Sequence, residues 1–146
     1  MQHEENLSLV KAAWATFASR DIDRIAALFA EDAEWLAPQC NATAIALGGT
    51  YRMIGRDAIA HVIAREVPRL FHNISVEFRG FYAQGRTVVV EQRMSATLPN
   101  GASYANDYCF VFECLDGKIK RMREYMDTAS GHIQIFAKGH PLATAA

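Results

Sequence analysis

Three side chains with acid–base or charge-stabilising chemistry are spaced so that neighbouring strands of one sheet would bring them together: Arg93, Tyr108 and Glu124. A carboxylate can take up and return a proton, whereas a phenol and a guanidinium can donate hydrogen bonds to an oxygen on which negative charge develops. All three residues lie within residues 86–128, where two glycine-containing turns separate three strand-like segments. This arrangement predicts a site for proton transfer from water or from an acidic C–H bond.

The two turns determine which residues of these strands lie opposite one another. If Asn100–Gly101 is a two-residue hairpin loop, Arg93 lies opposite Tyr108. If residues 115–117 form a three-residue loop with a left-handed glycine, Tyr108 lies opposite Glu124. One face of the sheet then carries Arg93, Tyr108 and Glu124 side by side. A bulge in the strand that carries Arg93 would break this row, because side chains alternate between the two faces.

The same register adds three residues that could surround a ligand on this face. Ser95 lies opposite Asn106, and Asn106 lies opposite Met126. Asn106 could satisfy neighbouring polar groups or orient a ligand carbonyl, and Met126 suits an adaptable pocket wall. The row itself also has two interpretations, because an Arg and a Glu beside a Tyr can form a structural ion pair as readily as a catalytic group.

Length and composition restrict the classes of protein that the chain can belong to. With 146 residues, 51% of them hydrophobic, the chain fits a single domain at residues 1–146. A net charge of -1 without a Lys/Arg cluster argues against a nucleic-acid partner. The chain lacks a signal-peptide pattern and any apolar run of about 20 residues, so we expect no membrane association and a cytoplasmic location. The three cysteines have no metal-ligand spacing, and we expect no metal site.

Apolar periodicity predicts helices first and a sheet after them. The predicted helices lie at about residues 4–19, after the capping residue Asp21, and after residues 55–57, where Pro68 is expected to bend or end the third helix. The predicted strands are residues 33–37, 73–82, 86–98, 102–114 and 118–128, with a long loop at 38–50. The tail after Thr128 includes Ile133, Ile135 and Phe136, and it either extends the last strand or docks on the core. This order predicts an α+β fold in which three N-terminal helices pack on a strongly curved, mainly antiparallel sheet.

The chain resembles the nuclear transport factor two-like superfamily of cone-shaped α+β barrels, which includes SnoaL-like polyketide cyclases, ketosteroid isomerase and limonene epoxide hydrolase. The resemblance rests on Asp21-Ile22-Asp23 to Phe29-Ala30-Glu31-Asp32-Ala33-Glu34-Trp35, on Gly55-Arg56-Asp57-Ala58-Ile59, and on Asp116-Gly117-Lys118-Ile119 running into Arg123-Glu124-Tyr125-Met126-Asp127. It implies a cone-shaped half-barrel with an internal pocket for a hydrophobic small molecule. It also implies catalysis without a cofactor or metal, and a homodimer formed through the outer face of the sheet.

Position by position, the resemblance carries over only in part. Ketosteroid isomerase uses an Asp before a Pro as its base, and the matching residue here is Ala37, which cannot take a proton. Limonene epoxide hydrolase holds water with a Tyr and an Asn on the first strand and a carboxylate on the last, and an Arg-x-Asp pair assists. The counterparts are Trp35, Ala37, Glu124 and the reversed pair Glu91 and Arg93. Of the water-holding groups, this chain keeps the carboxylate alone.

Two classes of function follow from these residues. The first is a cofactor-independent cyclase, isomerase or hydrolase in which Glu124 transfers the proton and Arg93 and Tyr108 stabilise charge. The residues expected around its hydrophobic substrate are Trp35, Glu91, Ser95, Asn106 and Met126. The second is a non-catalytic ligand-binding or dimerisation module of the same fold. An apolar pocket would raise the pKa of Glu124 and a neighbouring Arg would lower it, and the sequence leaves the balance open.

Overall fold

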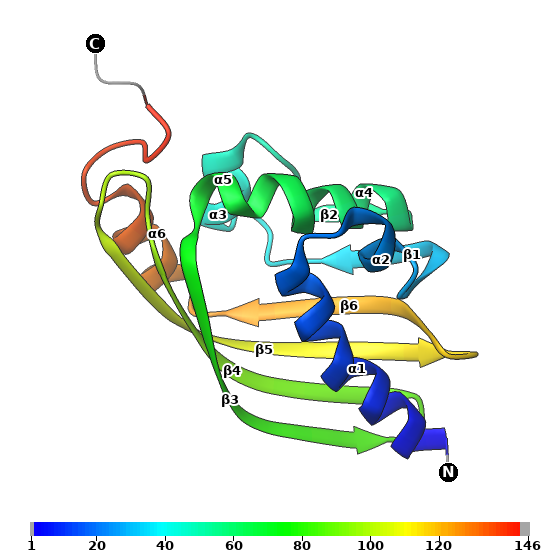
Figure 1. Ribbon diagram of the computed structural model, residues 1–146. Coiled ribbons are helices and arrows are strands. Elements are labelled where there is room, and N and C mark those ends of the chain that lie inside the picture. Colours follow the sequence, from blue (N-terminus) through cyan, green and yellow to red (C-terminus); the bar gives the residue numbers. More distant parts are fainter. Residues whose placement is uncertain (1, 144–146) are drawn as a thin grey trace.

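A curled, open sheet of six strands forms the body of the computed structural model, which describes residues 2–143 (Figure 1). The strand order is β2-β1-β6-β5-β4-β3, and β1 runs parallel to β6 whereas every other neighbouring pair is antiparallel. The strands are β1 (Phe29–Leu36), β2 (Arg52–Ile54), β3 (His72–Gln84), β4 (Thr87–Thr97), β5 (Ser103–Leu115) and β6 (Lys118–Met126). The fold is therefore α+β with a mixed sheet.

Helices pack on the concave face of this sheet. They are α1 (Gln2–Ser19), α2 (Ile22–Ala26), α3 (Ala42–Leu47), α4 (Arg56–His61), the π-helical turn η1 (Val62–Glu66), α5 (Val67–Leu70) and α6 (Thr128–Phe136). Helix α1 crosses in front of the sheet and contacts β3 and β4 (Figure 1). The predicted first helix is confirmed, and so is a second helix whose N-cap, Asp21, accepts a hydrogen bond from the backbone N–H of Arg24 at 3.2 Å.

Three segments differ from the sequence-based expectation. Strand β1 begins at Phe29, four residues before the predicted start, because α2 ends at Ala26. The predicted loop at residues 38–50 contains α3, which begins where the Asn41 side chain caps the backbone N–H of Ala44 at 2.9 Å. Of the two alternatives for the segment after Thr128, docking on the core is confirmed and extension of β6 is wrong. Residues 128–136 form α6, which the side chain of Asp127 caps, and Ile135 of this helix is buried in the core.

The helix around Pro68 neither ends nor breaks at the proline. The backbone N–H of Val67 donates to the carbonyl of Val62, five residues earlier, so the turn before Pro68 is π-helical. A proline ring clashes with the carbonyl four residues before it in a regular helix, which is that of Ala64 here. The wider turn relieves this clash, and the chain stays helical to Leu70.

The register at the first hairpin is one residue away from the predicted one. A two-residue loop would require residue 99 to donate its N–H across the hairpin, and Pro99 has none. Instead the N–H of Leu98 donates to the carbonyl of Ala102 at 2.8 Å, and residues 99–101 form a three-residue loop in which Gly101 has φ +86°. As a result Tyr108 lies opposite Gln92.

At the second hairpin, the pairing of β5 with β6 is shifted by two residues from the predicted pairing. A shift of two residues leaves every side chain on its predicted face of the sheet. Asp116 and Gly117 have φ of 53° and 74° and form a two-residue loop of the type I′ kind instead of the expected three-residue loop. A bulge at Lys120 in β6 adds one further residue to the shift. Glu124 therefore lies opposite Phe110 rather than Tyr108, yet on the same face as both.

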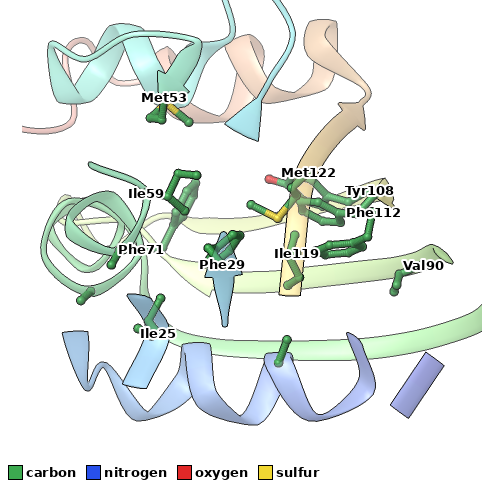
Figure 2. Close-up of a cluster of buried hydrophobic side chains, with 14 of the residues drawn as sticks. Ile25, Phe29, Met53, Ile59, Phe71, Val90, Tyr108, Phe112, Ile119 and Met122 are labelled. Carbon is green, nitrogen blue, oxygen red and sulfur yellow. The ribbon is translucent and has the colours of Figure 1, made fainter. Parts of the chain in front are cut away.

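The core lies between the concave face and the helices. Side chains with almost no exposed surface come from all parts of the chain, and Figure 2 shows a part of this cluster. Its members include Ile25, Phe29, Ile59, Phe71, Phe112, Ile119 and Met122. Burial of such side chains supplies most of the driving force that holds helices on the sheet.

Candidate functional site

A cavity of about 910 Å³ lies between the concave face and the helices. Its size is within the range of small-molecule sites, and its wall is predominantly apolar. The aromatic residues in this wall are Trp14, Phe17, Trp35, Phe71, Phe78, Tyr108 and Phe110. They come from α1, β1, β3, β5 and the C-terminal end of α5, so the cavity exists only in the folded chain.

Glu124 is the buried carboxylic acid of this wall. It is 8% exposed, and its Oε1 accepts a 2.9 Å hydrogen bond from the indole Nε1 of Trp35. Burial raises the pKa of Glu124 to about 7, and the hydrogen bond from Trp35 opposes this rise. Both the neutral and the ionised form are therefore populated at neutral pH, as a residue that alternates between acid and base requires.

A second carboxyl group in the wall, Glu66 on η1, has the opposite electrostatics. Its oxygens lie 2.6 Å from Arg69 and 3.4 Å from His61. The hydrogen bond from Arg69 lowers the pKa of Glu66, so this group stays ionised and paired at neutral pH. Of the two carboxyl groups, only Glu124 is poised to exchange a proton near neutrality.

Tyr108 presents a phenol to the same cavity from β5. Burial raises the pKa of Tyr108 well above its usual range, so the phenol keeps its proton. Its oxygen lies 2.6 Å from the hydroxyl of Tyr104, whose oxygen accepts a 3.3 Å hydrogen bond from Nδ2 of Asn106. The three side chains form a buried chain that fixes the position of the Tyr108 hydroxyl.

Three of the site residues predicted from the sequence line the cavity, and two others lie close to it. Trp35, Tyr108 and Glu124 line the cavity. Asn106 is buried and donates to Tyr104 and to the carbonyl of Asp127. Met126 lies opposite Tyr108 on the concave face. Within residues 2–143, neither Asn106 nor Met126 is part of the cavity wall.

Arg93, Glu91 and Ser95 occupy the other face of the sheet, so the predicted row of Arg93, Tyr108 and Glu124 is wrong. Arg93 lies opposite Asp107, and its Nη1 is 2.9 Å from a carboxylate oxygen of that residue. Glu91 and Ser95 share this outer face because alternate residues of a strand point the same way. The physical reason is the three-residue hairpin loop, since a shift of one residue reverses the facing of every side chain relative to the partner strand.

Gln92 occupies the position opposite Tyr108 that was predicted for Arg93. The polar–apolar alternation of β4 in the sequence indicated this position. Gln92 is 3% exposed, lines the cavity and lies opposite Tyr108. The even-numbered residues Met94, Ala96 and Leu98 are apolar, whereas their odd-numbered neighbours are polar. This alternation assigns Gln92 to the buried face without any assumption about the loop. The sequence-based prediction of the site also missed Tyr104, although Tyr104 lies on the same face of β5 as Tyr108.

Helices packed into the concave side of a curled mixed sheet are the arrangement of the nuclear transport factor two-like folds. The chain belongs to the SnoaL-like domain family, which its residues 10–122 match. No protein among curated sequences matches it significantly.

Solved structures share this fold over nearly the whole chain. TerC, co-crystallised with polyporic acid, is 28% identical, with a TM-score of 0.76 over 90% of this chain and 98% of TerC. An NTF2-like protein from Burkholderia xenovorans LB400 is 22% identical, with a TM-score of 0.75 over 92% of this chain and 98% of that protein. A limonene-epoxide-hydrolase-like epoxide hydrolase from M. tuberculosis is 20% identical, with a TM-score of 0.72 over 94% of this chain and 93% of that enzyme. The last two similarities establish the fold alone.

Residues 2–143 contain neither a helix that could span a membrane nor a cluster of metal-ligating side chains. Within these residues, no helix has the length and apolar character that crossing a membrane demands. Over the same part of the chain, His, Cys, Asp and Glu side chains do not gather in groups of three that could hold a metal ion.

Proposed function

We propose that this protein is a cofactor-independent enzyme that uses Glu124 to move a proton on a mostly apolar small molecule bound in the cavity. The observation that carries the proposal is the Glu124 carboxyl group itself, which is buried in an apolar wall with a pKa of about 7. Perturbed acids in a cavity are typical of catalytic sites. The neighbouring Tyr108 supplies a phenol that stays protonated, which suits hydrogen-bond donation to a developing oxyanion.

The reaction class that this pair supports best is proton abstraction next to a carbonyl group. Ionised Glu124 takes the proton as the C–H bond breaks. The electron pair of that bond forms a carbon–carbon double bond to the carbonyl carbon, and the π pair of the carbonyl group moves to its oxygen, which gives an enolate. Tyr108 donates a hydrogen bond to this oxygen, and Trp35 holds the carboxyl group in position. An enolate that is conjugated with a further double bond takes this proton back from Glu124 at another carbon. Alternatively, the enolate carbon attacks a carbonyl in the same molecule, and neutral Glu124 protonates the alkoxide that forms. Isomerisation and ring closure follow from these two outcomes.

Hydrolysis is less well supported by the same geometry. A carboxylate that activates water needs further groups to hold that water, and Ala37 offers no hydrogen bond where an Asn would. Arg93 pairs with Asp107 on the outer face and cannot assist. The likeness to TerC, which was crystallised with polyporic acid, supports a small-molecule ligand for this cavity.

A binding module without turnover is the second candidate. The observation that favours it is the position of Arg93 on the outer face of the sheet. The guanidinium group that the sequence predicted beside Glu124 and Tyr108 is therefore not in the cavity. In that case Glu124 and Tyr108 would hold a ligand through hydrogen bonds alone.

Deuterium exchange distinguishes the two candidates. The protein is incubated in D₂O with enolisable bicyclic ketones such as 2-tetralone, and loss of the acidic C–H signal is followed by NMR. We expect wild-type protein to accelerate exchange and Glu124→Gln to lose about 100-fold or more of this acceleration. Glu91→Gln is the matched control, because Glu91 is an exposed carboxyl group on the outer face. Binding of a ketone by wild-type protein without accelerated exchange would favour the binding module.

A further inference from the structure

Asn106 on β5 lies at one end of the hydrogen-bonded chain that leads through Tyr104 to Tyr108. It is 3% exposed, and its amide group contacts two backbone groups. The Nδ2 atom donates to the carbonyl of Asp127, and the Oδ1 atom accepts from the backbone N–H of Asp107, both at 2.9 Å. The reversed amide would place oxygen against a carbonyl and nitrogen against an N–H. The two backbone groups therefore determine which end of the Asn106 amide donates.

The hydroxyl group of Tyr104 accepts a hydrogen bond from this amide. The Nδ2 atom of Asn106 lies 3.3 Å from the Tyr104 oxygen, and an amide nitrogen donates hydrogen bonds without accepting them. The proton of the Tyr104 hydroxyl therefore points away from Asn106 and needs a different acceptor.

The acceptor of this proton is the Tyr108 oxygen, 2.6 Å away, a distance typical of an O–H···O hydrogen bond. Tyr104 is 1% exposed, and within residues 2–143 its hydroxyl makes hydrogen bonds with Asn106 and Tyr108 alone. If Tyr108 donated to Tyr104 instead, the Tyr104 proton would be buried without an acceptor among these residues, which is unfavourable. Tyr104 is therefore the donor in this pair, and Tyr108 is the acceptor.

Tyr108 is left with a proton that no described residue accepts. Across residues 2–143, its hydroxyl makes one hydrogen bond, in which Tyr104 is the donor. Burial raises the pKa of Tyr108 well above its usual range, so the hydroxyl keeps its proton. Tyr108 lines the cavity, whereas in the same part of the chain Tyr104 and Asn106 are not part of the cavity wall. The Tyr108 O–H is therefore free to donate to a molecule in the cavity.

We propose that Asn106 is a positioning residue, which orients the chain so that Tyr108 donates its O–H to a carbonyl or enolate oxygen of the ligand. The hydrogen bonds all point the same way, from the amide through the two phenols toward the cavity. Each polarises the next, which makes Tyr108 a stronger donor. This inference rests on the proposed function, because it specifies which ligand oxygen Tyr108 holds while Glu124 takes the proton from the neighbouring carbon.

Asn106→Asp tests the orientation because it reverses the chain without changing the size of the side chain. A carboxylate accepts hydrogen bonds and donates none, so in this variant the Tyr104 O–H donates to the new carboxylate. The Tyr104 oxygen then accepts from Tyr108, and the Tyr108 proton is no longer available to the ligand. The melting temperature of the variant verifies that it is folded.

The probes are 2-acetylnaphthalene and 2-isopropenylnaphthalene, which share one shape and differ by C=O in place of C=CH₂. The measured quantity is the dissociation constant of the alkene divided by that of the ketone, obtained by equilibrium dialysis at about pH 8.5. At this pH Glu124, with its pKa of about 7, is ionised and donates no hydrogen bond. The two probes differ in solvation in water by the same amount for every variant, so this difference cancels when ratios are compared between proteins.

We expect the ratio to fall about 10-fold in Asn106→Asp and in Tyr108→Phe, since each removes the donor to the ketone. Tyr104→Phe should stay within about threefold of wild type, because Tyr108 keeps its proton. The double variant Asn106→Asp/Tyr104→Phe should recover to the value of Tyr104→Phe, because the carboxylate no longer acts through Tyr104. A merely structural role of Asn106 predicts no such recovery.

The infrared stretch of the bound ketone, labelled with ¹³C at the carbonyl, gives a second readout. A hydrogen bond to a carbonyl lowers its stretching frequency. The frequency should therefore rise in Asn106→Asp and Tyr108→Phe and fall again in the double variant. Asn6→Asp is the matched control, because Asn6 is a buried amide that donates to the carbonyl of Gly85 at 3.4 Å and is not part of the cavity wall that residues 2–143 form. It should change neither the ratio nor the frequency.

Four outcomes would overturn the inference: no binding of the ketone by wild-type protein, an unchanged ratio in Tyr108→Phe, an unchanged ratio in folded Asn106→Asp, or no recovery in the double variant. If Asn106→Asp does not fold, Tyr108→Phe decides, since a Tyr108 that faced the ligand without its proton would show no loss. Exchange of 2-tetralone that is lost in Glu124→Gln, together with any of these outcomes, would keep the proposed function and reject the orientation. The expected ratios without such exchange would reject catalysis and keep the orientation.

Discussion

The indole N–H of Trp35 on β1 donates a 2.9 Å hydrogen bond to Oε1 of Glu124 on β6, the parallel neighbour of β1. The two residues are 89 positions apart in the chain, and both line the cavity. The indole N–H of Trp35 is therefore a donor to a carboxyl group that the apolar wall buries. The bond stabilises the ionised form of Glu124, whereas burial favours the neutral form. The balance of these two effects sets the pH range in which Glu124 can act as a base.

Trp35→Phe should therefore raise the pKa of Glu124 above its wild-type value of about 7. The substitution removes the donor and keeps an aromatic ring in the cavity wall. We expect the rising limb of the pH–rate profile for ketone exchange to move to higher pH. Trp14→Phe is the control, since Trp14 lines the cavity without bonding to Glu124. An unshifted profile in Trp35→Phe would show that the hydrogen bond does not govern the titration.

Stability should depend on pH through Glu124, in a direction unusual for a carboxyl group. The pKa is raised from 4.5 to about 7 on folding, so the folded chain binds a proton more tightly than the unfolded chain. The wild-type free energy of unfolding should contain a contribution that is complete below pH 4.5 and is lost as the pH rises to 7. The expected loss is about 3 kcal/mol.

Glu124→Gln removes this contribution because its amide does not titrate. Chemical denaturation of both proteins at several pH values measures it as a difference. The stability of Glu124→Gln relative to wild type should increase between pH 4.5 and 7 and then level off. A difference that is constant with pH would mean that Glu124 titrates alike in the folded and unfolded chain.

Tyr108→Phe should reduce proton exchange by about 100-fold, because it removes the donor to the developing oxyanion. Tyr104→Phe should reduce it less, by about 10-fold, since the Tyr108 hydroxyl remains but loses its fixed partner 2.6 Å away. Steady-state exchange rates of the two single variants and the double variant measure the coupling. Additive effects of the two substitutions would contradict a shared hydrogen-bonded chain.

Arg93→Leu should leave ketone binding and exchange within about twofold of wild type. Arg93 contacts Asp107 on the outer face, and both side chains are partly exposed, so their ion pair contributes at most about 1 kcal/mol to stability. Exchange rates and denaturation curves test the two statements together. A loss of activity comparable to that of Glu124→Gln would return Arg93 to the catalytic role that the sequence suggested.

The hairpins show why the register was only partly predictable. At the second hairpin the loop and the bulge at Lys120 each shifted the pairing by one residue, so Tyr108 and Glu124 still share a face. At the first hairpin a single shift separated Arg93 from that face. The missing N–H of Pro99 and the polar–apolar alternation of β4 both pointed to the observed register, but the Asn-Gly signal suggested a shorter loop.

Local patterns in the sequence determined the first helix, the four long strands and the α+β class. Each of these depends on residues that are near neighbours in the chain, so the periodicity of apolar side chains suffices to predict them. The tertiary structure decided the hairpin register, the chain of Asn106, Tyr104 and Tyr108, and the environment of Glu124. A pKa depends on desolvation and on hydrogen-bond donors, and both come from segments far away in the sequence that only the folded chain brings together.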